Sequence, residues 1–175
     1  MLDGSGKYSR AAQDGRVFSV ANQAAVAVTA AYAAIFTGLC VGNPVGSQVM
    51  LSLLKFGFGN TILGISVGTI GIMGGAMGAV PITASLTPDN LLLGGPASKA
   101  VATAGQTINA GPAPTLLMVC GQTGTGAVNS WEGHTSIVDI DGAIVIPPGY
   151  YVATYAFMLA GASLQFSFTW EELLH

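Results

Sequence analysis

A glycine-flanked serine is the strongest catalytic pattern in the chain. Gly64, Ser66 and Gly68 match the G-x-S-x-G pattern of a nucleophile elbow. Asp89 and His134 follow in the order Ser, Asp, His that α/β-hydrolases use. An elbow needs a strand that turns sharply into a helix, whereas Ser66 lies within strand-like alternation followed by more glycines. The pattern therefore predicts a strand serine, and we expect no enzyme activity.

The densest polar cluster is the segment WEGHTSIVDID, which contains Glu132, His134, Asp139 and Asp141. Asp139 and Asp141 fall on one face of a strand, and neighbouring carboxylate oxygens are calcium ligands. The spacing matches no calcium loop, and a single histidine is too little for zinc. The glycine-rich residues 121–126 lack the Lys-Ser/Thr of a phosphate-binding loop. We expect neither a metal site nor a cofactor site.

Aromatic residues gather near the C-terminus, at Tyr150, Tyr151, Tyr155 and Phe157. Such a row could form a sugar-binding face. Tyr151, Tyr155 and Phe157 share one parity along a strand, so packing explains them equally well. We favour a role in the core or in a subunit interface.

Scarcity of charge is the clearest signal in the composition. Only 13 of 175 residues are charged, which is 7%, compared with about 25% in ordinary soluble domains. Residues 18–54 carry no charge. A surface of roughly 7,900 Å² would then hold about one charge per 600 Å². Such a surface predicts a protein that works inside a membrane or a protein assembly. The net charge of −3 excludes the basic field that nucleic-acid binding requires.

An assembly explains this composition better than a membrane does. A spanning helix needs about 20 mostly apolar residues, and the best candidate, residues 24–41, is rich in alanine and only weakly hydrophobic. Gly, Pro and Asn interrupt the other uncharged stretches at turn-like positions. No loop carries the Lys/Arg cluster that orients membrane proteins.

The hydrophobic pattern predicts one all-β domain over residues 17–175. Strict alternation in residues 164–171 (LQFSFTWE) indicates a strand with one buried face. Residues 49–58 are apolar on both faces and predict a strand buried from two sides. The 25 glycines disfavour helix, and we assign the ambiguous residues 24–36 to a strand. We expect eight to ten strands in an antiparallel β-sandwich.

Residues 1–16 predict an extended N-terminal arm, because they are polar and contain several glycines. The arm carries three cations, Lys7, Arg10 and Arg16, which would meet an acidic surface on a neighbour.

Two local features carry definite structural expectations. Asp141-Gly142 lies between two apolar runs and predicts a two-residue hairpin turn of type I′. Cys40 and Cys120 lie in apolar strand-like runs, where buried free thiols are common.

Several segments resemble a group of small proteins encoded by tailed phages. These segments are TGLCVGNP, LSLLKFGF, IDGAIVIPPGYYVATYAF and FSFTWEE. The resemblance covers nearly the whole chain from Arg16 onward, and residues 144–151 and 166–172 are its most recognisable parts. It implies a β-sandwich, of jelly-roll type, that forms a structural part of a phage particle. Similar small sandwich proteins often act as trimeric cement (decoration) proteins on capsids, and others build tails or fibres.

We therefore expect a structural virion protein, a homotrimeric capsid cement protein that binds itself and the major capsid protein. It would be made in the host cytoplasm and sit on the capsid exterior, without nucleic acid, membrane, cofactor or small-molecule substrate. The expected interface residues are Lys7, Arg10, Arg16, Tyr150, Tyr151, Trp170 and Glu171. Two alternatives stay open: a tail, fibre or adhesin component that binds host glycan and, favoured least, a small integral membrane protein.

Overall fold

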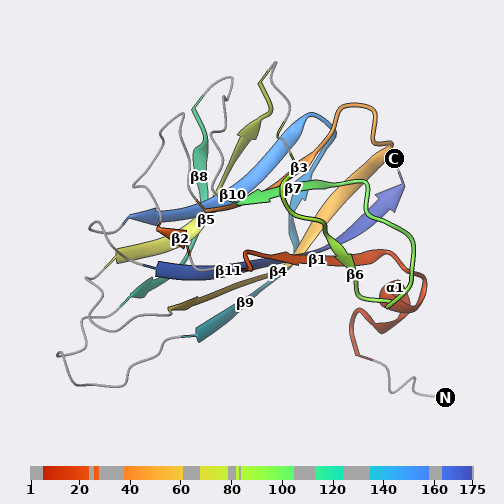
Figure 1. Cartoon of the computed structure of the whole chain (residues 1–175), viewed down its shortest axis with the longest axis horizontal. Coiled ribbons are helices and arrows are strands. Elements are labelled where there is room, and N and C mark those ends of the chain that lie inside the picture. Colours follow the sequence, from red (N-terminus) through yellow and green to blue (C-terminus); the bar gives the residue numbers. More distant parts are fainter. Residues whose placement is uncertain are drawn as a thin grey trace.

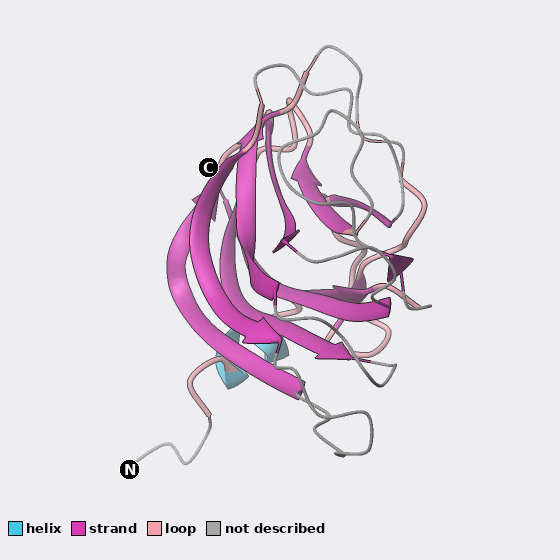
Figure 2. Cartoon of the chain, turned by 90° about the vertical axis from the view of Figure 1, so that its left-hand side faces the viewer, coloured by secondary structure: helices cyan, strands magenta, loops and turns pink. Residues whose placement is uncertain are grey.

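Two antiparallel β-sheets pack face to face and form a β-sandwich, so the expectation of an all-β sandwich is confirmed (Figures 1 and 2). This is a computed structural model. It describes residues 6–23, 26–27, 38–60, 68–78, 82, 84–104, 113–123, 135–157 and 163–174. The described part of the chain contains no helix long and apolar enough to cross a lipid bilayer.

The first sheet has the strand order β6-β1-β11-β4-β9, and the short β2 also pairs with β11. Its strands are β1 (Val17–Ala21), β2 (Val26–Ala27), β4 (Val49–Asn60), β6 (Asp89–Asn90), β9 (Thr135–Ile146) and β11 (Ser163–Leu174). The second sheet has the order β7-β3-β10-β5-β8. Its strands are β3 (Leu39–Asn43), β5 (Gly68–Ala76), β7 (Val101–Ala104), β8 (Thr115–Thr123) and β10 (Tyr150–Phe157).

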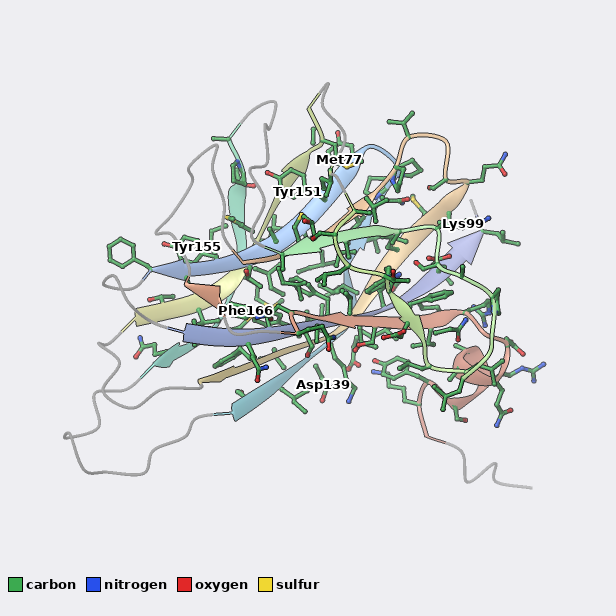
Figure 3. The ribbon with its side chains drawn as sticks, in the orientation of Figure 1. Met77, Lys99, Asp139, Tyr151, Tyr155 and Phe166 are labelled. Atoms are coloured by element: carbon green, nitrogen blue, oxygen red, sulfur yellow. The ribbon has the colours of Figure 1, made fainter. Side chains whose placement is uncertain are left out.

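The predicted alternation of β11 is confirmed. Its inner-face side chains, from Leu164 to Trp170, are buried between the sheets, and Figure 3 shows Phe166 among them. Aromatic rings on β4 and β1 pack against these side chains. The ring centroids of Phe56 and Phe168 are 5.1 Å apart, and Phe18 stacks on Trp170 at 6.2 Å. Such contacts add to the stabilisation from buried apolar area.

A β-bulge explains why β4 is apolar on both faces. Opposite β11, Leu53 pairs with Trp170 and Lys55 pairs with Thr169, so Leu54 is an extra residue. Leu53 faces the core, and Leu54, the extra residue of the bulge, lies on the outer face. The prediction that this strand is buried from two sides is confirmed at Leu54, whereas the neighbouring Lys55 side chain is 44% exposed.

The hairpin predicted at Asp141-Gly142 is wrong, because β9 continues through these residues. Both adopt the positive φ that a type I′ turn requires, 55° and 83°. They lie instead in a bulge, since β4 pairs with β9 on both sides of them, through Leu53–Ile144 and Lys55–Asp139. Asp-Gly favours positive φ, which occurs both in type I′ turns and in bulges. Because β9 stays paired with β4 before and after this dipeptide, the chain forms a bulge here and not a turn.

The N-terminal segment is not extended over its described part. Ser9–Gln13 form a short α-helix, α1, that packs on the outer face of the first sheet. Ala11 is buried there against Val17 and the bulged Leu54. A five-residue helix is too short to be stable by itself, so this packing is what stabilises α1.

Both cysteine thiols are free in the structure and point to opposite faces of the second sheet. Cys40 lies in a small outer cluster with Tyr151 and Met77, which are neighbours in Figure 3. Cys120 packs against the main core. Burial raises the pKa of both thiols, that of Cys120 to about 11.

Replacing Gly71 by alanine should destabilise the sandwich. A Cβ atom at this position would lie 2.3 Å from the carbonyl oxygen of Met118 on β8. Because backbone must move to make room, we expect a loss of about 1–3 kcal/mol in the free energy of unfolding measured with urea. Gly6→Ala is the matched control, since no atom lies within 4 Å of its Cβ position. Equal urea midpoints for Gly71→Ala and the wild type would contradict this close strand contact.

Candidate interaction surface

The sandwich has one protected side and one open side. On the protected side the sheets end in β6 and β7, which contain only 2 and 4 residues. On the other side they end in β8 and β9, of 9 and 12 residues. Within the described residues, β8 pairs only with β5, and β9 only with β4. Long edge strands present unpaired N–H and C=O groups to any strand that approaches.

Large apolar side chains are exposed on this open side. Val119 on β8 is 59% exposed and Ile137 on β9 is 67% exposed. Leu117, Val145 and Tyr150 are each about half exposed. Single exposed apolar residues are normal on a protein surface, but Leu117, Val145 and Tyr150 line one opening, and such a group marks a contact site. Ile137 lies apart from them, in a groove on the outer face of the first sheet.

An apolar opening of about 340 Å³ lies between the sheets at this side, and we call it the edge cleft. It is lined by Gly74, Gly75, Thr115, Leu117, Ile144, Val145, Ile146, Pro147, Tyr150, Tyr151 and Val152, of which none is charged. The strands are closely packed at Gly74, where a Cβ atom would lie 2.8 Å from the carbonyl oxygen of Tyr151 and 3.0 Å from Leu117 Cδ1.

A second apolar feature follows β6, where Leu91, Leu92 and Leu93 are all exposed. We call residues 91–95 the leucine loop. Leu93 at its tip is 92% exposed. The sequence shows this run of leucines between turn residues, so a search for exposed apolar loops could have found it. The sequence analysis did not single it out.

An electrostatic contact holds the N-terminal segment on the β9 bulge. The Lys7 Nζ atom lies 2.6 Å from Asp141 Oδ2, and the Tyr8 hydroxyl donates to the same carboxylate. These hydrogen bonds lower the pKa of the Asp141 carboxyl, and the bond to Asp141 raises the pKa of Lys7. The contact is therefore complete at neutral pH. It weakens in acid, as the pH falls through the lowered pKa of Asp141.

Two glutamates at the end of β11 have partners within the chain. Arg16 forms an ion pair with Glu171, whose backbone pairs with the start of β1. The buried Glu172 carboxylate accepts hydrogen bonds from the Ser98 hydroxyl at 2.6 Å and the Lys99 backbone N–H at 2.8 Å. These bonds fix the segment that leads into β7.

The structure does not gather the predicted interface residues on one surface. Lys7, Arg10 and Arg16 lie with Glu171 near α1, and Tyr150 lies across the sandwich at the edge cleft. The remaining two, Tyr151 and Trp170, are buried within the chain. Trp170 lies in the main core, on the buried face predicted for residues 164–171.

The residues weighed for catalysis or metal binding do not form a site that the structure describes. Ser66, Glu132 and His134 lie outside the described residues. Asp139 pairs with Lys55 at 3.1 Å, and Asp141 with the N-terminal segment. Among the described residues, no three His, Cys, Asp or Glu side chains come together as a metal site would require.

A shallow polar groove of about 430 Å³ crosses the outer face of the first sheet. Its lining contains Gln23, Gln165 and Ser167 but no charged residue. The groove wall is closely packed at Gly57, because a Cβ atom there would lie 2.5 Å from the Ser167 hydroxyl oxygen. Neutral amides and hydroxyls of this kind can hydrogen-bond a neutral polar ligand.

No protein-family description, curated protein or solved structure matches this chain. The resemblance to phage virion proteins therefore stays a prediction.

Replacing Asp141 by asparagine should loosen α1. Exposed ion pairs contribute little to stability, so trypsin should cleave after Arg10 only a few-fold faster than in the wild type. Asp139→Asn is the matched control, because Asp139 pairs with Lys55 and not with the N-terminal segment. If Asp141→Asn is cleaved no faster than Asp139→Asn, the ion pair does not hold the helix in place.

Proposed function

We propose that the chain is a structural virion protein, a capsid cement protein that forms homotrimers and stabilises a phage head through protein–protein contacts. The observation that carries this proposal is the group of apolar side chains on the open β8/β9 side, in a chain with 7% charged residues. Such a surface favours a protein partner over water.

The strand order supports a jelly-roll assignment, which is the fold that the phage resemblance implies. Eight strands, β1, β3, β4, β5, β8, β9, β10 and β11, are divided equally between the sheets. N-terminal β1 lies beside C-terminal β11, and β3 lies beside β10. Two interlocked Greek keys give this arrangement, and jelly rolls occur in viral capsid and lectin domains. The fold alone fixes no function, so the exposed apolar surface carries the argument.

The proposed mechanism is burial of apolar area. Each large side chain moved out of water contributes about 1.5–3 kcal/mol. No charge lines the edge cleft, so docking there does not bear the cost of desolvating a charged side chain. One contact of this size is weak against the entropy lost on association. Repetition around a symmetric shell makes the attachment strong.

The polar groove favours a second candidate, a tail, fibre or adhesin component that binds host glycan. Its glutamine amides and serine hydroxyl are neutral hydrogen-bond donors and acceptors on an open face of the sheet, and no charged side chain lines it. The partly exposed Tyr150 lies at the edge cleft and not in this groove. A glycan would therefore depend on Gln165 and its neighbours.

Substitutions at the two surfaces separate these functions. We expect the purified chain to sediment as a homo-oligomer and to bind phage heads assembled without it. Val119→Lys should lower head binding at least tenfold, because it places a charge on the apolar edge. Gln165→Lys is the matched control and should leave head binding unchanged. Loss of binding to host cell-wall sugars in Gln165→Lys, with no head binding by the wild type, would overturn the cement function and support the alternative.

A further inference from the structure

We propose that the leucine loop of one copy inserts into the edge cleft of a neighbouring copy, which gives a head-to-tail contact between identical chains. This inference rests on the proposed assembly function and names the partner as a second copy of the chain. The evidence for this contact is that the chain has one projecting apolar loop and one apolar opening.

The leucine loop is held in a defined shape. The Asn90 amide donates to the carbonyl oxygens of Gly15 and Pro96, each at 2.9 Å, and its Oδ1 accepts from the Leu92 N–H at 2.8 Å. The Gly95 N–H donates to the carbonyl oxygen of Leu92 at 2.7 Å, which closes the turn. A loop fixed in this way loses little conformational entropy on binding.

The backbone of the turn is closely packed. A Cβ atom at Gly95 would lie 2.8 Å from the carbonyl oxygen of Leu92. The Leu91 N–H is bonded to the carbonyl oxygen of Val17 at 2.9 Å, so the first leucine is tied to β1. The loop therefore presents Leu93 outward as a convex apolar surface.

The edge cleft has the complementary character. Leu117 and Val145 flank the opening, and Ile144 lines it from β9. The opening has a volume of about 340 Å³, which leaves room for an apolar side chain from outside. Projection and opening both consist of apolar groups, so their contact leaves no buried charge without a partner.

Their positions on the sandwich require a second copy. In the first sheet, the leucine loop follows β6 at one edge and the edge cleft adjoins β9 at the opposite edge. A chain cannot fill its own cleft across the sheet. A contact between two different surfaces is heterologous, and it closes into a ring when the rotation between copies allows. The trimer in the proposed function is one such ring.

Disulfide trapping tests this contact directly. Leu93→Cys and Val145→Cys are made in separate full-length chains, mixed and oxidised. We expect a covalent dimer in the mixture and at least tenfold less in either variant alone, since a heterologous contact brings the two different positions together. The wild type controls for Cys40 and Cys120, and Gln165→Cys mixed with Leu93→Cys controls for random collision.

Either of two results would overturn the contact: no more dimer in the mixture than in the Gln165→Cys control, or equal dimer in each variant alone. A charge at the loop tip gives a second readout. Leu93→Asp should shift the sedimenting species towards monomer, whereas Gln165→Asp, which is also exposed but lies on the outer face of the first sheet, should not. Circular dichroism checks that both variants are folded.

The cement function can fail independently. Head binding by a chain that shows no mixed dimer overturns only the head-to-tail contact. A mixed dimer in a chain that does not bind heads overturns only the cement function.

Discussion

The aromatic packing between β4 and β11 is the interaction on which the rest of the sandwich depends. These strands lie side by side in the first sheet, and their inner faces supply Phe56, Phe166, Phe168 and Trp170 to one buried cluster. The rings of Phe56 and Phe166 stack with centroids 6.0 Å apart. Apolar side chains from β1, β3, β5, β7, β8, β9 and β10 pack against this cluster, so it sets the spacing of the two layers.

The core is filled at its middle and left open at one side. Towards β6 and β7 the buried Glu172 carboxylate ties the connecting segment to β11 through two hydrogen bonds. Towards β8 and β9 the described residues leave an apolar opening between the sheets, the edge cleft. Because the chain has few charged residues, this side exposes apolar side chains to water. The proposed contact with a neighbouring chain would remove these side chains from water.

The burial pattern of an individual strand could be predicted from the sequence, whereas the order in which strands pair could not. The alternation from Leu164 to Trp170 specified a buried strand, because its period is a local property. Asp141-Gly142 specified positive φ correctly but not the connection, since a bulge and a hairpin use the same backbone conformation. The edge cleft depends on which strands end the sheets, and that order follows from long-range pairing. The exposure of Leu93 depends on hydrogen bonds from Asn90 to Gly15 and Pro96, of which Gly15 is distant in sequence.

Amide hydrogen exchange in the assembled protein tests the central claim most directly, which is that a neighbouring chain covers the β8/β9 side. Alternate amides of β8 and β9 point away from β5 and β4 and would face solvent in a lone protomer. If a neighbour covers them, they exchange as slowly in the assembly as the amides of the central strands β4 and β11. Fast exchange of these outward amides in the assembled protein would contradict the account.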